Sequence, residues 1–142
     1  MDFPLRLETE KKTVMICEDE PDILKLYGLA LKPKYNVILV NSGEECIKRF
    51  IEERKRGNKI HLLLVDYKIG NMSGDLIARE IKDYSETKII LITAYNLDDS
   101  VLKELKESDC IANFIKKPIH LSSLIELVAH TLNQIETVSN IG

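Results

Sequence analysis

The sequence predicts an α/β fold in which a five-stranded parallel sheet carries helices on both of its faces. The first observation is a set of four short runs rich in Val, Ile and Leu, which are typical of strands buried on both faces of a parallel sheet. The second is that segments with the apolar spacing of a helix lie between the runs. The third is that the connections are short, which forces right-handed crossovers and therefore helices on both faces.

In the first part of the chain, a strand is expected at about residues 13–17. The helix after it should begin at Pro21, because the N–H group that proline lacks has no partner in the first turn of a helix anyway. A second strand at 37–40 leads to a helix that should begin after Ser42, whose spacing to Glu45 is that of a capping box.

The middle of the chain is expected to hold the third strand, at about residues 60–66. The segment 67–74 that follows is interpreted as a loop, and Ser73 near its end can cap the next helix. That helix should direct Ile77 and Ile81 towards the core, because residues four positions apart share one face of a helix.

The last third of the chain continues the alternation of strands and helices. A fourth strand is expected at 88–93, followed by a short helix whose start is marked by Asn96 and Asp99. A fifth strand at about 111–116 precedes the last helix, at about 121–136, which has the cleanest amphipathic pattern in the chain.

The chain of 142 residues is expected to form one domain over residues 13–136, because its length is near the usual size of a single domain. No linker, internal repeat or low-complexity segment divides it. Residues 1–12 are charged and irregular and are interpreted as an N-terminal tail. Residues 137–142 are interpreted as a C-terminal tail.

The composition argues against several classes of protein. The net charge of −3, from 20 basic and 23 acidic residues, argues against a dedicated nucleic-acid-binding domain. The three cysteines, Cys17, Cys46 and Cys110, have no CxxC spacing, so neither a disulfide framework nor a zinc site is expected. No apolar run approaches about 18 residues and the N-terminus lacks the apolar core of a signal peptide, so we expect a cytoplasmic protein outside the membrane.

The chemistry of the chain is expected where the predicted strands end. Glu18 and Asp19 follow the first strand, Asp66 ends the third, Thr93 ends the fourth, and Lys117 follows the fifth. In open parallel sheets, ligands bind beyond the carboxyl ends of the strands, so these side chains should converge on one edge. The combination of carboxylates, a hydroxyl and an ammonium group suits the binding of phosphate and magnesium.

Three carboxylates on one edge point to a bound cation. Two like charges 4 Å apart repel by about 4 kcal/mol at an intermediate dielectric, so such a cluster persists mainly when a cation lies within it. Oxygen ligands with room for water favour Mg²⁺ over a full calcium cage. The alternative is that Glu18, Asp19 and Asp66 are separate, solvated acids in loops.

This pattern resembles the receiver domain of two-component response regulators, the family that includes the chemotaxis regulators. The resemblance covers about residues 13–136 and rests on four motifs in the same order. The motifs are Glu18 and Asp19 in Cys-Glu-Asp-Glu-Pro, Asp66 in Leu-Leu-Val-Asp-Tyr-Lys-Ile-Gly-Asn-Met-Ser-Gly, Thr93 in Leu-Ile-Thr-Ala, and Lys117 in Lys-Lys-Pro. The resemblance implies a flavodoxin-like (βα)5 three-layer sandwich with the strand order 2-1-3-4-5.

The resemblance also implies a phosphoacceptor site that depends on Mg²⁺. Asp66 would take a phosphoryl group from a phosphohistidine. Asp19, Asp66 and the backbone carbonyl of Lys68 would bind Mg²⁺ directly, and Glu18 would bind it through water. The ion would neutralise charge that develops on the phosphoryl oxygens.

Three further residues would couple the phosphoryl group to a change of surface. The resemblance implies that Lys117 pairs with Asp66 at rest and with a phosphoryl oxygen afterwards. Thr93 would move to bond another phosphoryl oxygen, and Phe114 would swing inward as the switch aromatic. The output surface would be the fourth helix, the fifth strand and the fifth helix.

The sequence departs from the common family pattern at several positions. Glu18 stands where Asp is commoner, and Gly70 stands where proline is usual. Lys68 and Tyr95 occupy positions that tune dephosphorylation in this family, and both are large enough to screen an acylphosphate from water. We therefore expect a long-lived phosphorylated form.

The resemblance implies a sensor histidine kinase or a phosphotransfer protein as phosphodonor, and a downstream effector protein as target. Ala112 and Leu127 stand where receivers of winged-helix transcription factors carry an acid and an arginine for dimerisation, so we expect a monomer or a weak dimer. One alternative is a pseudo-receiver that binds proteins without being phosphorylated. A second is a haloacid-dehalogenase-like phosphatase, but Lys68 stands where such enzymes need a second Asp, so we expect a signalling domain and not an enzyme.

Overall fold

The apolar runs of the sequence form one parallel sheet in a computed structural model that describes residues 11–83, 85–94 and 99–141, with side chains described to residue 133. The five strands of this sheet are β1 (Thr13–Cys17), β2 (Asn36–Val40), β3 (Leu62–Asp66), β6 (Lys88–Thr93) and β7 (Asn113–Lys116). Their order is β2-β1-β3-β6-β7. This order confirms the predicted 2-1-3-4-5 arrangement, because the intervening labels β4 and β5 belong to a separate small hairpin.

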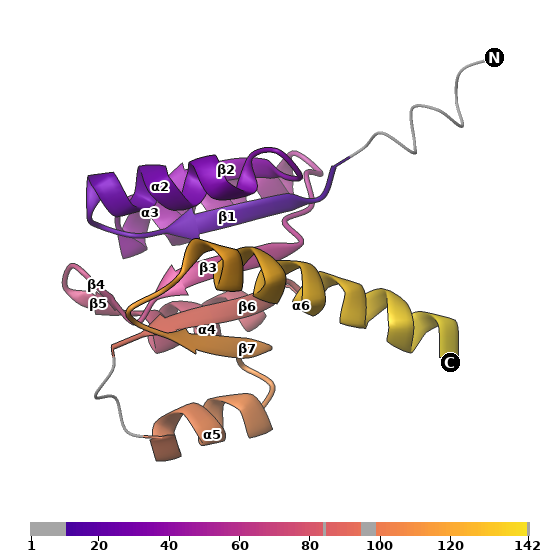
Figure 1. The fold of residues 1–142 in the computed structure, drawn as a ribbon. Coiled ribbons are helices and arrows are strands. Elements are labelled where there is room, and N and C mark those ends of the chain that lie inside the picture. The colour runs from indigo at the N-terminus through magenta and orange to yellow at the C-terminus, as the bar shows by residue number, and fades with distance from the viewer. Residues whose placement is uncertain (1–10, 84, 95–98, 142) are drawn as a thin grey trace.

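Helices cover both faces of the sheet in the part of the chain that the structure describes (Figure 1). They are α2 (Pro21–Leu31), α3 (Gly43–Lys55), α4 (Gly74–Lys82), α5 (Asp99–Glu107) and α6 (Leu121–Ile141). Buried residues of α2 and α6 form one core layer with the sheet, and those of α3, α4 and α5 form the other. The predicted three-layer α/β sandwich is therefore confirmed. No helix among the described residues is both long enough and apolar enough to cross a membrane.

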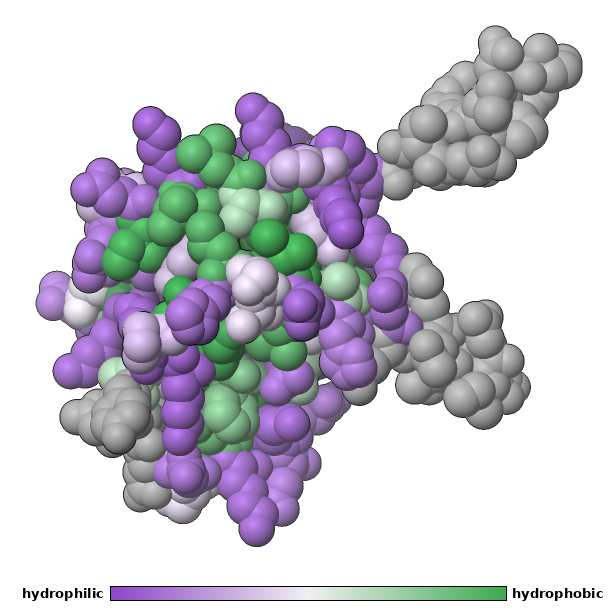
Figure 2. Space-filling view, viewed as in Figure 1, coloured by the Kyte–Doolittle hydropathy of each residue, from purple (hydrophilic) through white to green (hydrophobic). Residues whose placement is uncertain are grey.

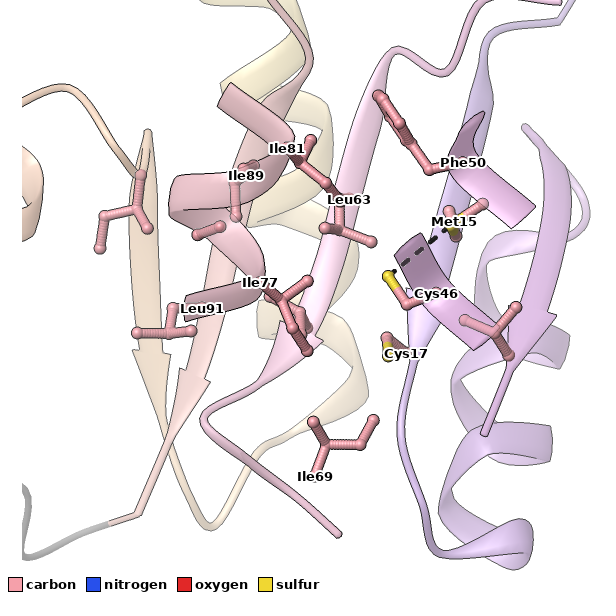
Figure 3. Close-up of a cluster of buried hydrophobic side chains, with 14 of the residues drawn as sticks. Met15, Cys17, Cys46, Phe50, Leu63, Ile69, Ile77, Ile81, Ile89 and Leu91 are labelled. Carbon is pink, nitrogen blue, oxygen red and sulfur yellow. Dashed lines mark hydrogen bonds between the residues drawn. The ribbon is translucent and has the colours of Figure 1, made fainter. Parts of the chain in front are cut away.

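The core is built on β3, in which all five residues are buried. Figure 3 shows the layer on the side of α3 and α4, where Ile77 and Ile81 of α4 and Phe50 of α3 lie around Leu63 of β3. The predicted inward positions of Ile77 and Ile81 are confirmed, since both are fully buried. Close packing of such large side chains fixes the position of the strand end that follows them.

The boundaries of most elements agree with the sequence, and the differences have local causes. The hydroxyl of Ser42 accepts a hydrogen bond from the backbone N–H of Glu45 at 3.1 Å, as the capping box predicts. Ser73 does precede α4, but its side chain makes no capping bond, so that part of the prediction is wrong. The last helix continues to Ile141, so the expected end at residue 136 is also wrong.

The segment predicted as a loop after Asp66 contains a short antiparallel hairpin, β4 (Lys68–Ile69) and β5 (Met72–Ser73). Gly70 begins its two-residue turn with a φ of +59°, which a type II′ turn requires at this position. Ser73 is paired with Lys68 across this hairpin. The backbone pairing sets the entry to α4 in place of a side-chain cap.

His61 fixes the start of the sheet, because its Nδ1 accepts a hydrogen bond from the backbone N–H of Thr13 at 3.0 Å. Burial, followed by the charges of Lys59 and Lys12, lowers the pKa of His61. The unfolded chain therefore binds a proton on this side chain more readily than the folded protein does. The stabilisation that neutral His61 gives the folded protein is present above the ordinary histidine pKa of 6.5 and is lost as the pH falls below it.

We predict that the free energy of unfolding falls more steeply between about pH 7 and about pH 5 in the wild type than in His61→Asn, which has no group to protonate there. Urea denaturation at each pH measures the difference. His120→Asn is the control, because His120 is exposed and should leave the wild-type slope unchanged. Identical slopes in the wild type and His61→Asn would contradict the prediction.

Candidate functional site

The carboxyl ends of the parallel strands bring the predicted residues to one edge of the sheet. Asp66 ends β3, the central strand, which pairs with β1 on one side and with β6 on the other. Cys17, directly before Glu18, is paired with Val65, directly before Asp66. On the other side of β3, Thr93 ends β6. The predicted convergence thus follows from the strand register.

Asp66 lies at the centre of the site with only 4% of its surface exposed. Its Oδ1 accepts a hydrogen bond from the backbone N–H of Lys68 at 3.0 Å. Its Oδ2 accepts one from Nζ of Lys117 at 2.6 Å, which makes a charge-assisted pair. Burial disfavours the charged form of Lys117, but the hydrogen bond to Asp66 and the charge of Asp66 outweigh it and raise the pKa of Lys117.

Glu18 is the most deeply buried acid of the site, with 1% of its surface exposed. Its Oε2 accepts a hydrogen bond from the backbone N–H of Glu20 at 3.0 Å, whereas Oε1 has no partner among the described residues. Burial, followed by the neighbouring Asp66, raises the pKa of Glu18 to about 8. Two adjacent carboxyl groups therefore lie in one low-dielectric environment. Glu18, the more deeply buried of the two, retains its proton near neutral pH.

Asp19 makes a backbone contact that the sequence did not predict. Its Oδ2 accepts a hydrogen bond from the backbone N–H of Gly70 at 3.0 Å, so it joins the start of α2 to the β4–β5 hairpin. In the described ranges, no three side chains of His, Cys, Asp or Glu form a group able to hold a metal ion by themselves. The expected cluster of three carboxylates around one ion is therefore not formed by side chains alone.

A pocket of about 470 Å³ opens beside Asp66. It is lined by Asp19, Glu20, Asp66, Tyr67, Lys68, Ala94 and Lys117. The side chain of Asp66 is 6% exposed and that of Lys117 is 34% exposed, so a ligand in the pocket can reach both. The pocket is large enough for a phosphoryl group with a hydrated ion.

The donors around this pocket fit Mg²⁺. Asp19 and Asp66 supply carboxylate oxygens to it, and Mg²⁺ is usually held by one or two carboxylates while it keeps several waters. A bound cation would also favour the charged form of Glu18 and would offer its unpartnered Oε1 a favourable charge. The site therefore suits a partly hydrated Mg²⁺ better than an ion enclosed by protein.

Thr93 and Phe114 lie on the far side of Asp66 from Glu18. Thr93 is fully buried, and its Oγ1 has no hydrogen-bond partner among the described residues. Its backbone carbonyl accepts a hydrogen bond from the backbone N–H of Lys117 at 2.9 Å. Phe114 is partly buried and packs against the core layer of α3, α4 and α5. An unpartnered buried hydroxyl is costly, so Thr93 is ready to bond an acceptor that enters the site.

Sequence reasoning missed the backbone donors of the site. The N–H groups of Glu20, Lys68 and Gly70 each bond a site carboxylate, at 3.0 Å in every case. Every residue except proline carries such a donor, so no residue pattern points to one. The one available signal was Gly70 itself, because proline at this position would have neither the N–H group nor access to a φ of +59°. Tyr95 and Asn96 fall outside the described residues.

Although proline is usual here in the family, this chain holds Gly70 at a positive φ. We therefore predict that Gly70→Pro weakens Mg²⁺ binding of this chain by about tenfold, because the hydrogen bond that orients Asp19 is lost. Gly70→Ala keeps the N–H group but strains a positive φ, so a smaller loss is expected. Since the chain has no Trp, amide chemical shifts during a Mg²⁺ titration are the measurement.

Gly57→Ala is the matched control, because Gly57 also has a positive φ, +81°, but contacts no site residue. Its Mg²⁺ affinity should equal that of the wild type. A folded Gly70→Pro variant that binds Mg²⁺ as tightly as the wild type would refute the role of this bond.

Comparison with known proteins agrees with the geometry. The family model of the response regulator receiver domain matches residues 14–129. The transcriptional regulatory protein YvrH of Bacillus subtilis is 28% identical over 137 residues, which cover 92% of this chain and 55% of YvrH. The transcriptional regulatory protein AruR of Pseudomonas aeruginosa is 27% identical over 123 residues, which cover 75% of this chain and 50% of AruR. The chain thus spans about half the length of these two relatives.

A similar solved structure is the signal receiver domain ascribed to a LuxO repressor protein of Vibrio parahaemolyticus. It has a TM-score of 0.76 and 26% sequence identity, and the match covers 92% of this chain and 97% of that domain. Receiver domains are signalling domains that interact with kinases and effectors and bind Mg²⁺ at an acidic pocket. With the match over most of its length, this chain belongs to the response regulator receiver domain family of two-component systems.

Proposed function

We propose that this chain accepts a phosphoryl group on Asp66 from a sensor histidine kinase or a phosphotransfer protein and thereby controls a downstream effector protein in the cytoplasm. The observation that carries the proposal is the buried Asp66 with Nζ of Lys117 at 2.6 Å from one of its oxygens, at the wall of an open pocket. A carboxylate held in this way is oriented for attack, and the ammonium group of Lys117 can stabilise the negative charge of the incoming phosphoryl group.

In the transfer step, a carboxylate oxygen of Asp66 attacks the phosphorus of a phosphohistidine. A P–O bond forms while the P–N bond breaks, and the electron pair of that bond returns to the imidazole, which takes up a proton. Mg²⁺, held by Asp19, Asp66 and the backbone carbonyl of Lys68 with Glu18 behind water, would neutralise charge on the phosphoryl oxygens. Lys117 pairs with the new phosphoryl oxygens in place of the Asp66 carboxylate.

The output depends on Thr93 and Phe114. The hydroxyl of Thr93 has no partner among the described residues, so a phosphoryl oxygen next to it gives it a strong acceptor. As Thr93 moves towards that oxygen, Phe114 fills the space behind it and changes the surface of α5, β7 and α6. An exposed ion pair of Lys116 with Asp99, at 2.7 Å, joins β7 to α5 within this surface.

We expect this surface to bind the effector as a monomer or a weak dimer. Ala112 and Leu127 are partly buried and uncharged, so they cannot form the acid–arginine contact of winged-helix receiver dimers.

We predict that incubation with Mg²⁺ and acetyl phosphate adds one phosphoryl group to the wild type and none to Asp66→Asn. Intact-mass spectrometry detects the group, and amide NMR should show the largest shifts near Thr93 and Phe114. Asp22→Asn removes an exposed acid of α2 outside the site and should be phosphorylated like the wild type. If neither acetyl phosphate nor a panel of phosphorylated histidine kinases modifies the folded protein, the chain is a pseudo-receiver.

We predict that the acylphosphate persists for many minutes at neutral pH, because Lys68 and Tyr95 are large enough to screen it from water. Lys68→Ala should shorten its half-life several-fold, as followed by the loss of the phosphoryl mass after acetyl phosphate is removed. Lys48→Ala, an exposed lysine of α3 that does not line the pocket, should leave the half-life unchanged. A wild-type half-life of seconds would contradict this prediction.

A further inference from the structure

A second hollow lies between α2 and the edge strand β2, and we refer to it as the α2–β2 groove. Its volume is about 440 Å³, and its apolar lining includes Gly28, Leu29 and Leu39. A Cβ atom on Gly28 would lie 3.1 Å from the side chain of Leu39, so the glycine allows Leu39 to pack directly against the backbone of α2. None of the residues that line this groove also lines the pocket beside Asp66.

The apolar lining is unusually accessible for large aliphatic side chains. Leu29 of α2 is 57% exposed and Leu39 of β2 is 41% exposed. Leu26, which also lies on α2, is 47% exposed. Figure 2 shows hydrophobic residues gathered over α2 on the face in view, with hydrophilic residues around them. A contiguous apolar patch with a polar border is typical of a surface that binds a partner.

The charged residues that line the groove are all basic: Lys11, Lys25 and Lys32. No acidic side chain lines the groove among the described residues, and none forms an ion pair with these three lysines there. The chain as a whole carries a net charge of −3, so this local excess runs against its overall charge. The groove therefore favours a negatively charged ligand.

We propose that the α2–β2 groove binds an acidic segment of a partner protein whose large apolar side chains cover Leu29 and Leu39. Burial of the two leucines supplies the hydrophobic contribution, and the lysines attract the acids and fix the register. A second copy of this chain fits less well, because a two-fold contact through the groove would place lysines opposite lysines. A nucleic acid would leave the leucines without apolar contacts.

This contact goes beyond the proposed phosphorylation, because the groove shares no residue with the pocket at Asp66. The test uses the full chain and a helical peptide of about 18 glutamate and leucine residues as the probe. Titration followed by amide NMR should give saturable shifts confined to α2 and β2, with weaker binding at higher salt. Asp66→Asn should bind equally well, so a failure of phosphorylation and a failure of this contact are separate results.

Two matched pairs of exposed residues test the role of each side chain. Leu29→Ser should weaken binding about fivefold, whereas Leu76→Ser, at a leucine of α4 that is 56% exposed, should have no effect. Lys32→Glu should also weaken binding about fivefold, whereas Lys48→Glu on α3 should not. All four positions are exposed, so the variants should keep the wild-type spectrum elsewhere.

Several results would overturn the proposal. Equal affinity of all four variants would show that the groove is not the binding surface. Equal affinity for a peptide with glutamine in place of glutamate would show that the lysines do not select acids. Binding of anionic phosphatidylserine vesicles that Leu29→Ser abolishes, without saturable binding of the peptide, would assign the groove to a lipid surface. Self-association that Leu29→Ser abolishes would assign it to a second copy.

Discussion

The structure depends on the complete burial of β3 between β1 and β6. Leu62 and Leu64 face one helical layer and Leu63 and Val65 face the other, so a shift of one residue in the pairing would exchange the two faces. The register is therefore strongly fixed, and with it the position of Asp66 at the end of the strand. A buried carboxylate in this place is held by the packing of Leu62 to Val65, far more rigidly than a loop could hold it.

Electrostatics sets the environment of this fixed carboxylate. Nζ of Lys117 donates a hydrogen bond to one oxygen of Asp66. The buried Glu18, whose pKa is raised to about 8, lies beside Asp66. Lys117 stabilises the charge of Asp66, and the neighbouring Glu18 retains a proton near neutral pH, so a bound cation or phosphoryl group would change both contacts. The unpartnered hydroxyl of Thr93 adds a third group ready to respond, which makes the site sensitive to what enters it.

The fold also separates two kinds of surface. The pocket at Asp66 opens at the carboxyl ends of the central strands, whereas the α2–β2 groove lies along the edge strand and the outer face of α2. An edge strand has unpaired backbone groups and partly exposed side chains, so it is suited to contacts that the buried centre of the sheet cannot make. The proposed phosphorylation and the proposed partner contact therefore use different parts of one small domain.

The sequence by itself determined the five strands, the layers and the placement of Asp66 and Lys117, because apolar runs and strand-end residues are local features. The tertiary structure alone decided the β4–β5 hairpin, the missing cap at Ser73 and the bond from Gly70 to Asp19. These depend on backbone N–H groups that nearly every residue carries and on pairings between distant segments. Only the folded chain shows which of those groups meet.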